Sequence, residues 1–146
     1  MIRKKFWNRY KLEDLNRREW ELLCDGCGKC CLIKIDTGDR KPVTYTKIAC
    51  RLFDDSTCSC TQYKMRKELV KDCLVLTKQT LEKCYSWMPS TCAYRLLKEG
   101  KKLKPWHHLI SGSFETVHQA GISIKEKTLK EFDIPEEDWQ NHCMEE

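Results

Sequence analysis

Leu12, Leu15, Trp20, Leu22 and Leu23 recur at roughly helical spacing among charged neighbours. This spacing is typical of an amphipathic helix, which would deliver the chain into Cys24. Two short runs at 32–35 and 43–46, rich in β-branched or aromatic residues, flank a turn-rich segment at 36–40. Runs of this kind on either side of a turn predict a β-hairpin.

The second half of the chain contains further signals for helices and a strand. Good helix formers at 91–100 end on a glycine and predict a short helix with Cys92 in its first turn. A second short helix is expected at 113–120, followed by a strand at 122–124. Pro135 precedes three acidic residues and predicts the start of a C-terminal helix.

With 146 residues, the chain is expected to form one domain spanning positions 1–146. The mixture of short helices and a hairpin predicts a small α+β fold. The segment 50–73 shows no clear period, so we expect it to be irregular and pinned by metal ligands. Charged residues make up 34% of the chain and interrupt every apolar run, so no membrane-spanning segment is predicted. The net charge of +5 permits an anionic partner without requiring one.

Cysteine changes this picture, because the chain contains eleven. Four of them fall within eight residues, in the order Cys24-Asp25-Gly26-Cys27-Gly28-Lys29-Cys30-Cys31. Thiols on C-x-x-C turns can converge on one point, and the two glycines ease the curvature of the backbone around an ion or cluster. The motif therefore predicts a metal site.

A disulfide framework is the main alternative explanation for so many cysteines. The cysteine count is odd, and the positively charged N-terminus is not followed by the apolar run of a signal peptide. We therefore expect a cytoplasmic protein with reduced, metal-bound thiolates.

Several short motifs, in this order, resemble a known family. They are similar to the bacterial YcgN group of CxxCxxCC cysteine-cluster proteins, which is related to the YkgJ-type zinc- or iron-chelating proteins. The resemblance covers nearly the whole chain and implies a cytoplasmic metal-binding protein. The matching segments are Cys24 to Leu32, Ala49-Cys50-Arg51, Cys58-Ser59-Cys60, Cys73 with the residue before it, Thr91 to Leu97, and Pro105-Trp106-His107.

The resemblance also implies which thiols are metal ligands. Cys84 and Cys143 lie outside its pattern and are expected to be spare thiols. His107 matches the pattern, whereas the family more often has proline at the position of His108. The nine matching thiols are Cys24, Cys27, Cys30, Cys31, Cys50, Cys58, Cys60, Cys73 and Cys92.

The spacing of the cysteines does not by itself identify the metal. Zinc takes about four thiolates at each site, whereas closely spaced C-x₂-C-x₂-C runs also ligate [4Fe–4S] clusters, so zinc and iron both remain. The leading expectation is a metal- or cluster-binding protein, whether metal-stabilised, metal-handling or electron-transferring. One alternative is an iron–sulfur or metal-dependent enzyme. Another is a metal-stabilised adaptor that binds nucleic acid or protein through the basic segment Lys98–Lys104.

Overall fold

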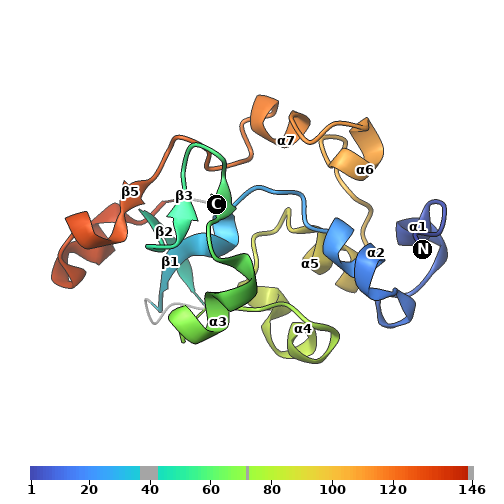
Figure 1. Cartoon of the computed structure of the whole chain (residues 1–146), viewed down its shortest axis with the longest axis horizontal. Helices are drawn as coiled ribbons and strands as arrows, with labels where there is room; N and C mark the ends of the chain where they lie inside the picture. The colour runs from blue at the N-terminus through green and yellow to red at the C-terminus, as the bar shows by residue number, and fades with distance from the viewer. Residues whose placement is uncertain (37–42, 72, 145–146) are drawn as a thin grey trace. The chain divides into compact units, whose positions relative to one another are not determined.

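The computed structural model describes residues 1–36, 43–71 and 73–144. The chain divides into two compact units, each built from two stretches of sequence. Unit 1 comprises Met1–Gly26 and Leu76–Ile122, and unit 2 comprises Cys27–Val75 and Ser123–Glu146. The α+β class is confirmed, because unit 1 is helical and unit 2 contains the strands (Figure 1). The expectation that residues 1–146 form one domain stays a prediction.

Unit 1 consists of short helices. Those helices, including single 3-10 turns labelled η, are α1 (Phe6–Arg9), η1 (Leu12–Asp14), α2 (Arg17–Leu22), α4 (Lys78–Cys84), η4 (Tyr85–Trp87), α5 (Ala93–Lys98), α6 (His108–Ser111) and α7 (Thr116–Gln119). They pack around a core of Phe6, Leu15, Trp20, Leu23, Leu81, Ala93 and Tyr94.

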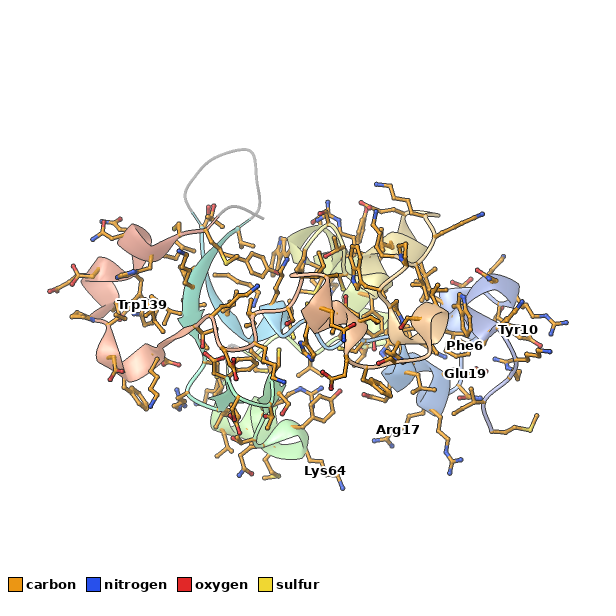
Figure 2. The ribbon with its side chains drawn as sticks, turned by 90° about the horizontal axis from the view of Figure 1, so that it is seen from above. Phe6, Tyr10, Arg17, Glu19, Lys64 and Trp139 are labelled. Carbon is orange, nitrogen blue, oxygen red and sulfur yellow. The ribbon has the colours of Figure 1, made fainter. Side chains whose placement is uncertain are left out.

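The predicted first helix corresponds to α2, which begins after a capping box. The side chain of Asn16 accepts from the N–H of Glu19, and the Glu19 carboxylate accepts from the N–H of Asn16. Glu19 is fully buried and also binds the Arg3 guanidinium at 2.8 Å. Figure 2 shows Glu19 lying close to Phe6 and Tyr10 of the N-terminal segment. The chain therefore approaches Cys24 from a firmly fixed helix.

The helices at 91–100 and 113–120 are also confirmed, in shorter form, as α5 and α7. Cys92 is the N-cap of α5 and not a member of its first turn. Helix α4 was not predicted, although Thr77 and Thr80 form a capping box at its start. Helices α6 and α7 lie side by side in Figure 1.

Unit 2 contains two small sheets. The elements are η2 (Lys29–Cys31), β1 (Leu32–Ile35), β2 (Thr44–Ala49), β3 (Phe53–Asp54), β4 (Ser59–Cys60), η3 (Tyr63–Met65), α3 (Arg66–Leu69), β5 (Leu129–Lys130), η5 (Glu131–Asp133) and η6 (Glu136–His142). Strand β2 pairs with β1 in the antiparallel sense and with β5 in the parallel sense, whereas β3 and β4 form a separate antiparallel pair.

The predicted strands at 32–35 and 43–46 are confirmed as β1 and β2, and most of their predicted turn lies outside the described residues. The segment 50–73 is more ordered than expected, because it contains the β3–β4 pair and α3. The strand predicted at 122–124 is wrong. Ile124 is 4% exposed, packs into the core of unit 2 and donates its N–H to the carbonyl of Cys27 at 3.0 Å.

The C-terminal helix predicted after Pro135 is present as the 3-10 helix η6. It contacts β2, and Trp139 on it lies toward the strands in Figure 2. In the described part of the chain, no helix is long and apolar enough to cross a membrane.

Candidate metal centre

Five of the predicted ligands line one cavity of unit 2. The cavity has a volume of ≈350 Å³, and its thiols are Cys30, Cys31, Cys50, Cys60 and Cys73. These cysteines come from four separate segments of sequence. The fold therefore gathers thiols that are up to 43 positions apart in the chain (30 to 73).

The β1–β2 pairing brings together the first of these thiols. Leu32 lies opposite Ala49, so the residues just outside the hairpin ends, Cys31 and Cys50, are neighbours. The N–H of Cys50 donates to the carbonyl of Cys31 at 2.8 Å. Because the register of the hairpin is fixed by this pairing, the Cys30-Cys31 pair is held next to Cys50.

The β3–β4 pair and α3 supply the remaining thiols of the cavity. Cys60 lies opposite Phe53 across the β3–β4 ladder. Cys73 follows α3, and its N–H donates to the carbonyl of Val70 at 3.0 Å. The ammonium of Lys67 donates to the Cys73 carbonyl at 3.1 Å and fixes the same turn.

The thiols of the cavity influence one another's ionisation. The pKa of Cys31 lies above its ordinary value because its thiol is hydrogen-bonded to Cys30 and is buried, and because Cys60 and Cys50 are near. Burial is the main cause that raises the pKa of Cys50 and of Cys73. Several thiolates cannot ionise together here without a compensating positive charge, and a metal cation is a group that supplies one.

Charged and aromatic side chains complete the cavity wall. Lys34, Arg51 and Arg66 line it together with Glu131, Tyr63 and Trp139. None of these six is predicted as a site residue by the sequence, because no spacing signal links them to the cysteines. The neighbouring Lys64 points away from unit 2 into solvent (Figure 2).

Cys27 and Cys58 form a second, buried pair in unit 2. They are 8% and 7% exposed, and the Cys58 thiol donates to the Cys27 carbonyl at 3.4 Å. Cys58 adopts a left-handed backbone conformation with φ 56°, which is uncommon for a residue other than glycine. Burial is the main cause that raises the pKa of Cys58 to about 11.

The last two predicted ligands, Cys24 and Cys92, belong to unit 1, so the CxxCxxCC motif is divided between the units. Cys24 is exposed, and Cys92 packs partly buried against the core of unit 1. Cys84, outside the family pattern, is 3% exposed in unit 1. Cys143, also outside it, is exposed and forms a backbone bridge to Thr46.

The side chains of the adjacent His107 and His108 contact backbone groups of unit 1. His107 Nε2 lies 2.7 Å from the carbonyl of Leu23, and its Nδ1 accepts from the N–H of Leu109 at 3.0 Å. Burial lowers the pKa of His107 below its ordinary value. A neutral ring that donates through Nε2 and accepts through Nδ1 satisfies both contacts.

His108 acts on the same part of the chain. Its Nε2 lies 2.8 Å from the carbonyl of Leu22 and 3.2 Å from that of Cys24, and its ring stacks on Phe114. The two histidines therefore hold the end of α2, where the CxxCxxCC motif begins. This arrangement gives His107 and His108 a role in positioning the backbone that the sequence did not reveal.

The donor set fits a thiophilic metal, since it consists chiefly of sulfur. Cys30, Cys31, Cys50, Cys60 and Cys73 are the residues that would hold it in the cavity. As they stand, no group of three or more His, Cys, Asp or Glu side chains within residues 1–36, 43–71 and 73–144 could hold a metal ion. Binding of a metal ion in the cavity therefore requires the thiols to move closer to one another.

Comparison with known proteins places this chain in a family. A family model described as "CxxCxxCC: Putative zinc- or iron-chelating domain" matches residues 23–93, which include all nine predicted ligands. A UPF0260 protein of Rhodobacter capsulatus is 49% identical over 145 residues, covering 99% of this chain and 97% of that protein. The chain belongs to the UPF0260 family. The resemblance to CxxCxxCC cysteine-cluster proteins is thereby confirmed.

Two further UPF0260 relatives agree with this assignment. A protein of Pseudomonas putida is 48% identical over 139 residues, covering 95% of this chain and 92% of its own length. One from Parvibaculum lavamentivorans is 51% identical over 139 residues, covering 95% and 90%. No solved structure matches the chain.

Proposed function

We propose that this UPF0260 protein is a cytoplasmic metal-binding protein that holds zinc or iron through cysteine thiolates. Its principal site is the cavity of unit 2. The observation that carries the proposal is the gathering of five thiols around one cavity of ≈350 Å³. One tetrahedral zinc site needs four thiolates, and a [4Fe–4S] cluster also uses four, so the cavity supplies enough for either.

The remaining predicted ligands extend this proposal. Cys27 and Cys58 lie in the same unit, and Cys24 and Cys92 belong to the other. All nine thiols are proposed ligands, the seven of unit 2 and the two of unit 1. Metal binding stabilises the folded chain, because the ligands are dispersed in sequence and meet only in the folded state.

A reducing compartment is part of the proposal. All eleven cysteines are in the thiol form in the structure, and metal-bound thiolates persist where disulfides do not form. The family description as a zinc- or iron-chelating domain supports the metal binding on which this step depends.

The test is elemental analysis of the untagged protein purified without oxygen, with acid-labile sulfide and a visible spectrum on the same sample. Cys60→Ser should lower the bound metal strongly, because it removes a cavity thiol. Cys143→Ser is the matched control, since Cys143 is an exposed thiol of the same unit. Equal metal content in the two variants, or a folded wild type without metal, would overturn the proposal.

The same sample identifies the metal. Iron with sulfide and a brown chromophore would assign an iron–sulfur centre and favour redox chemistry. Colourless protein with bound zinc would assign a structural or metal-handling site. Either result supports thiolate binding, since both metals accept that donor set.

The size of the cavity favours a second candidate function, a metal-dependent enzyme. At ≈350 Å³ it falls within the range of roughly 300–1,000 Å³ that small-molecule sites occupy. A small molecule that alters the spectrum of the bound metal would support this role. A metal with a fully closed ligand shell, unaffected by any added small molecule, would count against it.

The adaptor hypothesis receives less support from the structure. Lys98 is paired with Glu82, and Lys101 with Glu99, so two cations of the basic segment are partly neutralised. Salt-dependent binding to nucleic acid that is lost on charge reversal of Lys102 and Lys104 would restore this hypothesis.

A further inference from the structure

Lys34 places a partly buried cation in the wall of the thiol cavity. It lies on β1, and its ammonium donates to the carbonyls of Cys30 at 2.7 Å and Leu32 at 3.0 Å. The same nitrogen lies 5.2 Å from the ring centroid of Tyr45, within reach of a cation–π interaction. These contacts hold the ammonium in place beside the Cys30-Cys31 pair.

The surroundings of Lys34 are unusual for a lysine. Burial lowers its pKa, and the nearby thiols of Cys30, Cys31, Cys73 and Cys50 act in the opposite direction. Four of the five cavity thiols are therefore electrostatic neighbours of this nitrogen. Burying an ammonium is costly unless negative charge compensates for it.

Within residues 1–36, 43–71 and 73–144, no carboxylate provides that compensation through an ion pair with Lys34. By contrast, Arg51 pairs with Glu131 at 3.6 Å. Arg66 donates to the carbonyl of Tyr63 and stacks on its ring. Among the three cations of the cavity wall, Lys34 is the one engaged with the backbone of a cavity cysteine.

The charge of a loaded centre matches this arrangement. Four thiolates around one divalent ion carry a net charge of about 2−, and hydrogen bonds to the sulfurs are a principal means by which proteins tune such centres. An ammonium has three donors, and the described contacts of Lys34 use two of them.

We propose that Lys34 is a positioning and charge-compensating residue for the metal centre. It fixes the backbone of Cys30 and offsets the negative charge of the metal-bound thiolates. The proposal rests on the thiolate metal site proposed above. It goes further by specifying that the cavity accepts a net-anionic metal–thiolate group and not a bare cation.

The test compares the full-length protein with Lys34→Met, Lys34→Arg and Lys47→Met. Methionine keeps an apolar stem, arginine keeps the charge, and Lys47 is an exposed lysine of the adjacent strand β2. Zinc affinity is measured by competition with a chromophoric chelator under reducing conditions. Cobalt(II) spectra report how many thiolates bind, and thermal unfolding of each metal-free variant reports folding.

We expect Lys34→Met to weaken zinc binding roughly 10–100-fold, as is typical when a residue supporting metal ligands is removed. Its cobalt(II) spectrum should keep the wild-type thiolate intensity, because no ligand is lost. The pH of half-loading should rise, because the cation that favours thiolate is missing. Lys34→Arg should recover most of the affinity, and Lys47→Met should match the wild type.

Wild-type affinity in a folded Lys34→Met protein would overturn the inference. Equal losses in Lys34→Met and Lys34→Arg would also overturn it, because the effect would then be one of packing and not of charge. Failure of the wild type to bind zinc or cobalt through thiolates would instead refute the proposed function itself.

Discussion

Gly28 offers a sharp test of the packing beneath the candidate metal centre. It has φ +80°, and a Cβ placed there would lie 2.8 Å from Cys58 Sγ, 3.0 Å from Ile124 Cγ1 and 3.1 Å from Phe53 Cε1. All three neighbours belong to unit 2, and Cys58 and Ile124 are part of its core. Gly28→Ala should therefore suffer a steric clash in addition to backbone strain.

Gly26 is the matched control. It has the same φ of +80°, and nothing lies within 4 Å of a Cβ built on it. Holding alanine in the left-handed region costs about 1–2 kcal/mol at either position. Overpacking adds about 1–3 kcal/mol at Gly28 alone, so we expect losses of about 1–2 kcal/mol for Gly26→Ala and about 2–5 kcal/mol for Gly28→Ala.

The assay is equilibrium urea unfolding of the reduced, metal-free proteins, followed by circular dichroism and tryptophan fluorescence. Zinc content after reconstitution should fall further in Gly28→Ala than in Gly26→Ala, because the clash displaces the Cys58 thiol. Equal free energies of unfolding for the two variants would refute the close approach of Gly28 to Cys58.

Three further predictions concern the supporting contacts. The pKa of Glu19 is lowered from 4.5 to about 2, chiefly by its hydrogen bond with Arg3. The stability that this carboxylate provides is therefore complete above pH 4.5 and is lost as the pH falls toward 2. Glu19→Gln should flatten this loss of stability in unfolding curves measured from pH 2 to 6. His107→Ala should lower the free energy of unfolding in urea by about 2–4 kcal/mol, because two buried backbone groups lose their partners. His108→Pro should lower it less, since proline suits the first turn of a helix. A reversed order would contradict the proposed role of His107. Removal of metal by a chelator should lower the melting temperature and speed proteolysis within 27–75, and an unchanged cleavage rate would argue against a stabilising metal.

The local pattern of the sequence was sufficient for several elements. Apolar residues at roughly helical spacing predicted α2, and the glycine at position 100 predicted the end of α5, because these signals act over a few residues. The pattern misled at 122–124, where Ile124 serves the core through packing and one hydrogen bond to Cys27, without pairing in a strand. Alternating apolar residues cannot distinguish these two forms of burial.

By itself, the sequence determined the chemistry of the candidate site. The count and spacing of the cysteines specify soft sulfur donors, and the order of the motifs specifies the family. Tertiary structure decided which thiols share the cavity, because the β1–β2 register sets Cys31 beside Cys50, while the β3–β4 pair and the turn after α3 supply Cys60 and Cys73. Tertiary structure also placed Lys34 in the wall of the same cavity, and no spacing in the sequence predicts this. Ligand type is a property of each residue, whereas the sharing of a site depends on distances that only the folded backbone fixes.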